Sequence, residues 1–114
     1  METEGIISWA DFENVRIHVG TVLRAEPFPE AVKPACRLTI DFGPLGIRKT
    51  SAQITVRYDP PDLVGRQVLA VTNFPAKRIA GFKSEVLVLG AVPGEGDVVL
   101  VRPDEKVPDG TRIR

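Results

Sequence analysis

Short runs of alternating apolar and polar residues, each ended by proline or glycine, recur along this chain of 114 residues. The clearest run lies at 36–42, where four apolar side chains alternate with Arg37, Thr39 and Asp41. A period of two is typical of a β-strand with one buried face. Ten prolines and ten glycines indicate many turns and few long helices. The pattern therefore predicts an all-β fold built from short strands.

The length of the chain predicts one domain over residues 1–114. A short helical turn is expected at 59–65, between the third and fourth strands, where small Greek-key barrels of the OB type carry a helix. We therefore expect a five-stranded OB-type Greek-key barrel at about 15–92, with a helix at 8–14 before it and a β extension at 93–114 after it. The expected strands cover 15–26, 36–42, 47–54, 67–74 and 85–92, with a further strand at 98–101.

The first expected strand is long and contains Gly20. A glycine within a strand usually marks a bulge, and long bent strands are typical of small closed barrels. We expect His18 to face solvent, and because it is the single histidine, a histidine-based metal site or catalytic triad is excluded. The alternation places Val15, Ile17, Val19 and Leu23 on one face and Arg16, His18 and Arg24 on the other.

The N-terminal helix is expected to be short and unusually apolar. Ser8 can cap it, and Asp11 lies at the third helical position, as in a capping box. Ile6, Trp9 and Phe12 provide a large apolar patch, which something must cover. The helix either plugs one end of the barrel or joins two copies of the chain.

The net charge is zero, but the charges are unevenly distributed. Residues 1–32 carry a net charge of −4, residues 33–83 of +6 and residues 84–114 of −2. A fold that gathers the middle segment on one face would present a basic patch despite the neutral total.

The stretch 73–90 concentrates this charge. Lys77, Arg78 and Lys83 lie between two apolar runs, and Pro75 ends the first run because it lacks a backbone donor. A basic loop with an aromatic residue, Phe82, held between buried strands suits a ligand with phosphates and flat bases. The alternative is a solvated loop whose cations keep the protein in solution.

The sequence of this stretch, NFPAKRIAGFKSEVLVLG, resembles the signature of the small tRNA-binding domains found as free-standing proteins and as tails of aminoacyl-tRNA synthetases. In that family an Asn-x-x-x-x-x-Ile/Met-x-Gly-x-x-Ser segment precedes the last barrel strand. Three earlier segments, 17–22, 25–31 and 50–55, fall in the order of the family, and together with this stretch they resemble the export-related chaperones of the family. The resemblance extends from about residue 8 to the C-terminus.

The RNA-binding residues are expected on the middle strands and the basic loop. The cations would neutralise phosphates, the polar side chains would make hydrogen bonds, and Phe82 would stack on a base. Five of these residues rest partly on the family motif, and the others rest on strand register, where a slip of one residue would reverse their direction. The expected residues are Arg48, Lys49, Ser51, Gln53, Asn73, Lys77, Arg78, Phe82, Lys83 and Ser84.

The resemblance also implies a homodimer built by the terminal extensions and chaperone activity toward unfolded or precursor polypeptides. Ile6, Trp9, Phe12 and Phe28 are the residues expected at an apolar seam for peptide binding or dimerisation. Two alternatives remain open: a purely peptide-binding export chaperone without significant RNA binding, and a module that only dimerises or docks onto a synthetase.

Catalytic chemistry is not expected. Neither a paired-carboxylate pattern, a glycine-rich phosphate loop nor a metal-ligand cluster occurs in the sequence, so we expect no enzyme activity, no cofactor and no metal. The single cysteine, Cys36, alternates with core residues and is expected to be one of them. With no signal peptide and no apolar run of about 18 residues, we expect a cytoplasmic protein without membrane insertion.

Overall fold

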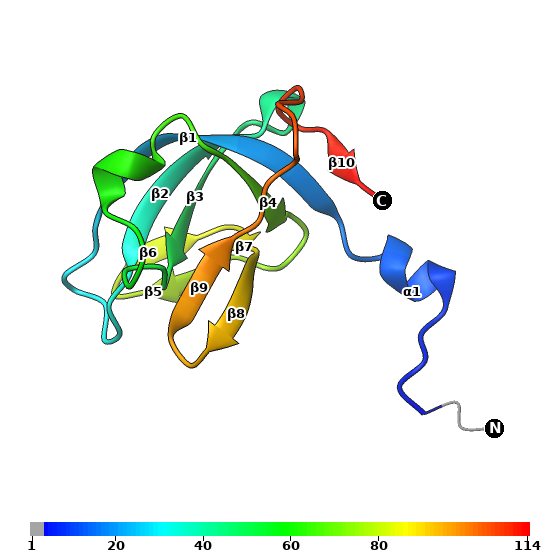
Figure 1. The fold of residues 1–114 in the computed structure, drawn as a ribbon, viewed down its shortest axis with the longest axis horizontal. Coiled ribbons are helices and arrows are strands. Elements are labelled where there is room, and N and C mark those ends of the chain that lie inside the picture. The colour runs from blue at the N-terminus through cyan, green and yellow to red at the C-terminus, as the bar shows by residue number, and fades with distance from the viewer. Residues whose placement is uncertain (1–3) are drawn as a thin grey trace.

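The computed structural model describes residues 4–114 as a nearly closed β-barrel with one short α-helix (Figure 1). The largest sheet has the strand order β3-β2-β1-β4-β7, and β10 also pairs with β1. The hairpins β5–β6 and β8–β9 form two further sheets. The all-β barrel prediction is confirmed. The elements are α1 (Trp9–Glu13), β1 (Ile17–Pro27), β2 (Cys36–Asp41), β3 (Ile47–Ala52), β4 (Gln67–Val71), β5 (Lys77–Ile79), β6 (Phe82–Ser84), β7 (Leu87–Val88), β8 (Gly90–Gly94), β9 (Asp97–Leu100) and β10 (Arg112–Ile113), with 3-10 turns at Gly43–Leu45 and Pro60–Leu63.

The long strand β1 organises the barrel. Its first half pairs with β4 on one edge and with β10 on the other, and its second half pairs with β2. The expected irregularity occurs between Val22 and Arg24 rather than at Gly20. Leu23 lies at this irregularity and is 46% exposed, so it does not share the burial of Val19. Gly20 instead permits close packing, since a Cβ there would lie 2.6 Å from Ile40 Cγ2.

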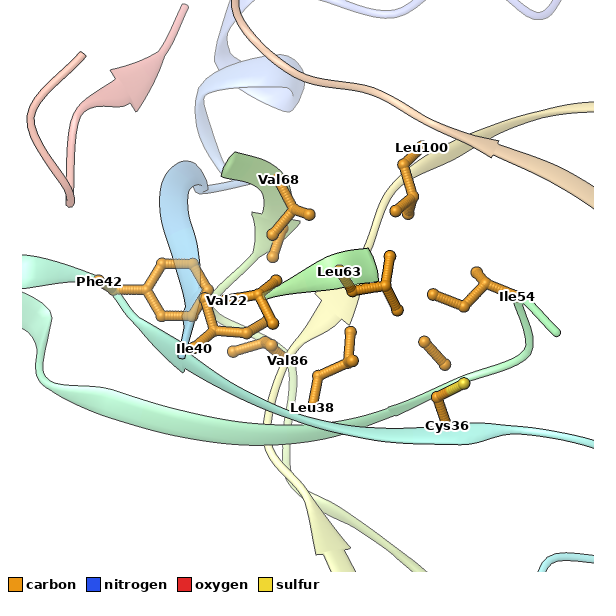
Figure 2. Close-up of a cluster of buried hydrophobic side chains, with 12 residues drawn as sticks. Val22, Cys36, Leu38, Ile40, Phe42, Ile54, Leu63, Val68, Val86 and Leu100 are labelled. Carbon is orange, nitrogen blue, oxygen red and sulfur yellow. The ribbon is translucent and has the colours of Figure 1, made fainter. Parts of the chain in front are cut away.

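The core fills the space inside the barrel. Figure 2 shows Leu38 and Ile40 of β2, and Phe42 directly after it. They face Val22 of β1 and Leu63 of the second 3-10 turn, and all five residues are buried. Cys36 belongs to the same cluster, as expected. Burial, followed by the charge of Asp59, raises the pKa of the Cys36 thiol.

The barrel is closed by side chains as well as by backbone. The amide of Glu85 donates to the Lys49 carbonyl (2.8 Å), and the Lys49 amide donates to Glu85 Oε1 (3.0 Å). Beside them, Thr50 Oγ1 donates to the Val86 carbonyl (2.7 Å) and lies 3.1 Å from Ser84 Oγ. These bonds join β3 to the end of β6 and to the two residues that follow it.

Helix α1 stands apart from the barrel (Figure 1). Ser8 caps it as expected, and both bonds of the capping box with Asp11 are present at 3.0 Å. No residue of α1 is buried, and Trp9 is 67% exposed. In a single chain the helix therefore does not plug the barrel end.

The C-terminal half differs most from the sequence-based prediction. The expected fifth strand, 85–92, is divided into β7 and β8, and β10 was not expected. The tail packs on the barrel: Thr21 Oγ1 donates to Asp109 Oδ1 (2.6 Å), and Gln67 Nε2 donates to the Val107 carbonyl (2.7 Å). Among residues 4–114, no helix is long and apolar enough to cross a membrane.

Candidate nucleic-acid interface

The basic segment after β4 forms a hairpin rather than the expected irregular loop. β5 and β6 are joined by Ala80 and Gly81, whose φ angles of 47° and 82° suit a two-residue type I′ turn. Arg78 lies directly opposite Lys83 in the register, and both side chains are exposed. Lys77 is also exposed and lies across from Ser84, so the hairpin displays all three expected cations.

The neighbouring strand β3 has the predicted register. Thr50 and Ala52 are buried, whereas Lys49 and Gln53 are exposed and Ser51 is half-buried. The hydroxyl of Ser51 and the amide of Gln53 are therefore on the outer side of this edge of the barrel, as expected.

Two hollows meet between β3 and the hairpin. They have volumes of about 500 Å³ and 480 Å³, and both are lined by Ser51, Gln53, Lys77 and Ile79. We call them together the hairpin groove. The first hollow has a mainly apolar lining, which includes Ile54, Phe74, Pro75, Leu87, Val88 and Val98, and the second adds Lys33 and Arg78.

Two of the expected RNA-binding residues make hydrogen bonds within the protein. The side chain of Asn73 accepts from the Arg16 amide (3.0 Å) and donates to the Asn14 carbonyl (2.7 Å). It thereby ties the segment after α1 to the end of β4. Ser84 is buried, and its Oγ accepts from the Ser51 amide (3.0 Å), so it serves barrel closure.

Two further expected residues lie away from the open groove. Arg48 donates to the Leu45 carbonyl (3.2 Å) near the start of β3. Phe82 is half-buried, and its ring lies edge-on to Phe28 with 5.4 Å between centroids. The guanidinium of Arg37 lies 5.2 Å from the Phe28 centroid and 5.8 Å from that of Phe82. This aromatic cluster fixes the hairpin against the loop after β1 and leaves Phe82 less available for stacking than expected.

The residues expected at an apolar seam do not come together. Ile6, Trp9 and Phe12 belong to the exposed N-terminal segment, and the rings of Trp9 and Phe12 are 5.6 Å apart. Phe28 follows the opposite end of β1 and is only 3% exposed. It is a packing residue of the hairpin, and it does not extend the N-terminal patch.

The sequence-based reasoning did not assign Lys33, Arg37 or the apolar lining of the groove to the site. The alternation at 36–42 indicated that Arg37 lies on the outer face of β2, where it is the cross-strand partner of Ser51. Lys33 lies in a proline-rich loop without periodicity, so its position depends on how that loop folds back toward the hairpin.

The sequence and the fold resemble those of known proteins. The model of the family "Putative tRNA binding domain" matches residues 17–112. The chain is 36% identical over 108 residues to a methionine–tRNA ligase of Porphyromonas gingivalis, and the match covers 95% of the chain but 16% of the ligase. Among solved structures it is similar to chaperone CsaA of Bacillus anthracis str. Ames (56% identity, TM-score 0.93) and to the CsaA chaperone protein of Picrophilus torridus (43%, 0.88). Each match covers 96% of this chain and 100% of the CsaA chain.

Proposed function

The chain belongs to the tRNA-binding domain family, and on that premise we propose that it binds tRNA or another structured RNA in the hairpin groove. The observation that carries the proposal is the meeting of the polar edge of β3 with the three exposed cations of the β5–β6 hairpin. Neither group of residues would form such a surface alone.

The chemistry of the groove suits an RNA strand. Lys77 and Arg78 in the groove, with Lys83 opposite Arg78 on the hairpin, would pair with phosphates. Ser51 and Gln53 would reach base edges or ribose hydroxyls. The apolar lining offers a surface to the faces of unpaired bases. Like charges directly opposite each other on a hairpin are destabilising, and a bound phosphate would relieve the repulsion between Arg78 and Lys83.

The test is tRNA binding by the Lys77→Gln/Arg78→Gln variant across a series of salt concentrations. Removing two phosphate contacts should reduce the magnitude of the slope of log affinity against log salt by about 1.4–1.8, because each contact releases roughly 0.7–0.9 counterions. The matched control, Arg102→Gln/Lys106→Gln, removes two exposed cations outside the groove and should keep the wild-type slope. Equal slopes for both variants would refute the assignment of the groove.

A second candidate function is chaperone activity toward unfolded or precursor polypeptides. It is favoured by the apolar hollow beside Phe74, which is 53% exposed, and by the high identity to two CsaA chaperones. Apolar side chains of a polypeptide would enter this hollow, and their binding would depend little on salt. The Phe74→Ser variant should weaken capture of a signal-peptide-like polypeptide and leave the salt slope for tRNA unchanged; full capture by the variant would contradict this assignment.

The proposal includes a homodimer formed through the N-terminal segment. A helix of five residues has little stability in water on its own, and Trp9, Ile6 and Ile7 are each at least 65% exposed. A second copy of the chain would cover them. Trp9→Ser should therefore shift the molar mass measured by light scattering from dimer toward monomer, and an unchanged dimer would exclude this seam.

The proposed setting is the cytoplasm, where tRNA is available. Docking onto a synthetase remains the alternative for a chain of this family. It predicts that tRNA binding by the isolated protein is weak at every salt concentration.

A further inference from the structure

A second group of cations surrounds His18, on the first half of β1. His18 Nδ1 lies 2.8 Å from Thr72 Oγ1, and Arg112 of β10 is its direct cross-strand partner. Arg16 lies two positions earlier in the chain, and its carbonyl accepts from the amide of the same Thr72 (2.9 Å). Arg48 is the second residue of β3, and its charge acts on His18. We call Arg16, Arg48 and Arg112 the arginine cluster.

The pKa of His18 depends on the charge of this cluster. His18 was expected to face solvent, but it is half-buried. This burial is the largest cause of the lowering of its pKa. The positive charges of Arg112, Arg16 and Arg48 lower the pKa further, in that order. All three guanidinium groups therefore act on one imidazole, although they come from segments 32 or more residues apart.

Part of the cluster is held in place by α1. Arg112 Nη2 donates to the Glu13 carbonyl (2.8 Å) and lies 3.3 Å from Glu13 Oε2, and the same carboxylate pairs with Arg114 at 3.9 Å. One carboxylate is thus shared between two arginines. Within residues 4–114, Arg112 Nε is buried without a hydrogen-bond partner. These contacts hold the guanidinium of Arg112 in a fixed position next to β1.

We propose that the arginine cluster is a second phosphate-binding site, which contacts the backbone of the RNA bound in the hairpin groove. Planar guanidinium groups bind phosphate oxygens in pairs, which a set of lysines would not do. This inference rests on the proposed function, but it concerns a surface outside the groove.

The two sites lie at opposite ends of β3. Arg48 is the second residue of the strand, whereas Ser51 and Gln53, which line the groove, lie three and five residues further on. At about 3.3 Å per residue this separation is roughly 17 Å, which one folded RNA can span. Contacts at both ends would hold one RNA in a fixed orientation along β3.

The experiment uses His18 as its probe. Because the chain has one histidine, its imidazole gives a single set of ring resonances in NMR spectra of the full-length protein. A phosphate next to the cluster would offset the positive charges and raise the His18 pKa. We expect that rise when total tRNA, or pyrophosphate as a minimal probe, is added to the wild-type protein.

Variants separate the two sites. Arg16→Gln/Arg48→Gln should abolish the rise and reduce the magnitude of the salt slope for tRNA by about 1.4–1.8, as two lost phosphate contacts predict. Arg102→Gln/Lys106→Gln is again the control and should preserve both. Lys77→Gln/Arg78→Gln should weaken binding, yet the rise should return at saturating tRNA.

The failures can be told apart. If tRNA binds with an unchanged His18 pKa and an unchanged slope in Arg16→Gln/Arg48→Gln, the second site is refuted and the groove is not. If tRNA does not bind at low salt, the proposed function fails, whereas a rise with pyrophosphate would still support phosphate recognition by the cluster. If the chemical shifts of His18 change with protein concentration but not with tRNA or pyrophosphate, the phosphate site is refuted. Contact between two copies of the chain would then explain the shifts.

Discussion

Replacing Thr50 with valine tests how the barrel is closed. Thr50 is fully buried, and its hydroxyl donates to the Val86 carbonyl at 2.7 Å while lying 3.1 Å from Ser84 Oγ. Valine has almost the same shape, so the substitution removes the hydrogen bonds without leaving a cavity. Both Val86 and Ser84 are themselves buried, which keeps water from replacing the lost donor.

The size of the effect follows from these contacts. A typical hydrogen bond contributes about 1 kcal/mol, and a buried acceptor left without a donor costs about 1–3 kcal/mol. Ser84 Oγ keeps its bond from the Ser51 amide, so the loss centres on the Val86 carbonyl. We expect Thr50→Val to lower the free energy of unfolding by about 2 kcal/mol, which for a domain of this size lowers Tm by roughly 8 °C.

Urea denaturation measures the free energy, and hydrogen exchange locates the change. The amides of Lys49 and Glu85, which bridge the same seam, should exchange faster in the variant. Thr39→Val is the matched control, since Thr39 is a half-buried residue of β2. Equal stabilities for the two variants, with unchanged exchange at the seam, would show that the hydroxyl does not hold the barrel closed.

Two further predictions concern β1. Gly20→Ala should destabilise the protein by about 1–3 kcal/mol in urea denaturation, because the added Cβ would lie 2.6 Å from Ile40 Cγ2 and 2.8 Å from the Phe42 ring; a neutral effect would mean that these core side chains shift easily. The lowered pKa of His18 means that the unfolded chain binds a proton more readily than the folded protein, so stability should fall as pH drops through and below 6.5. The His18→Gln variant should have a flatter dependence in that window, and the same slope in both proteins would assign it to carboxylates.

The helix cap and the strand register of this protein could be predicted from the sequence because each depends on residues that are close together in the chain. Ser8 and Asp11 complete a capping box three residues apart, and the alternation at 47–54 gave the register of β3 correctly. Gly20 shows the limit of prediction from local sequence. Its position in a strand predicted a bulge. In the structure it allows close packing of Ile40, which lies in β2, and of Phe42, which directly follows β2.

The sequence by itself determined the barrel class, the family and the pooling of positive charge in the middle of the chain, since alternation, turn residues and motif spacing are all local properties. Tertiary structure alone decided which polar groups remain available for a ligand. Asn73 and Ser84 fit the motif, but long-range hydrogen bonds to Asn14, Arg16 and Ser51 occupy their side chains. The segments with acidic totals supply Arg16 and Arg112 to a positive cluster, because pairing of β1 with β10 brings the two ends of the chain together. Net charge along a sequence does not record which side chains share a face.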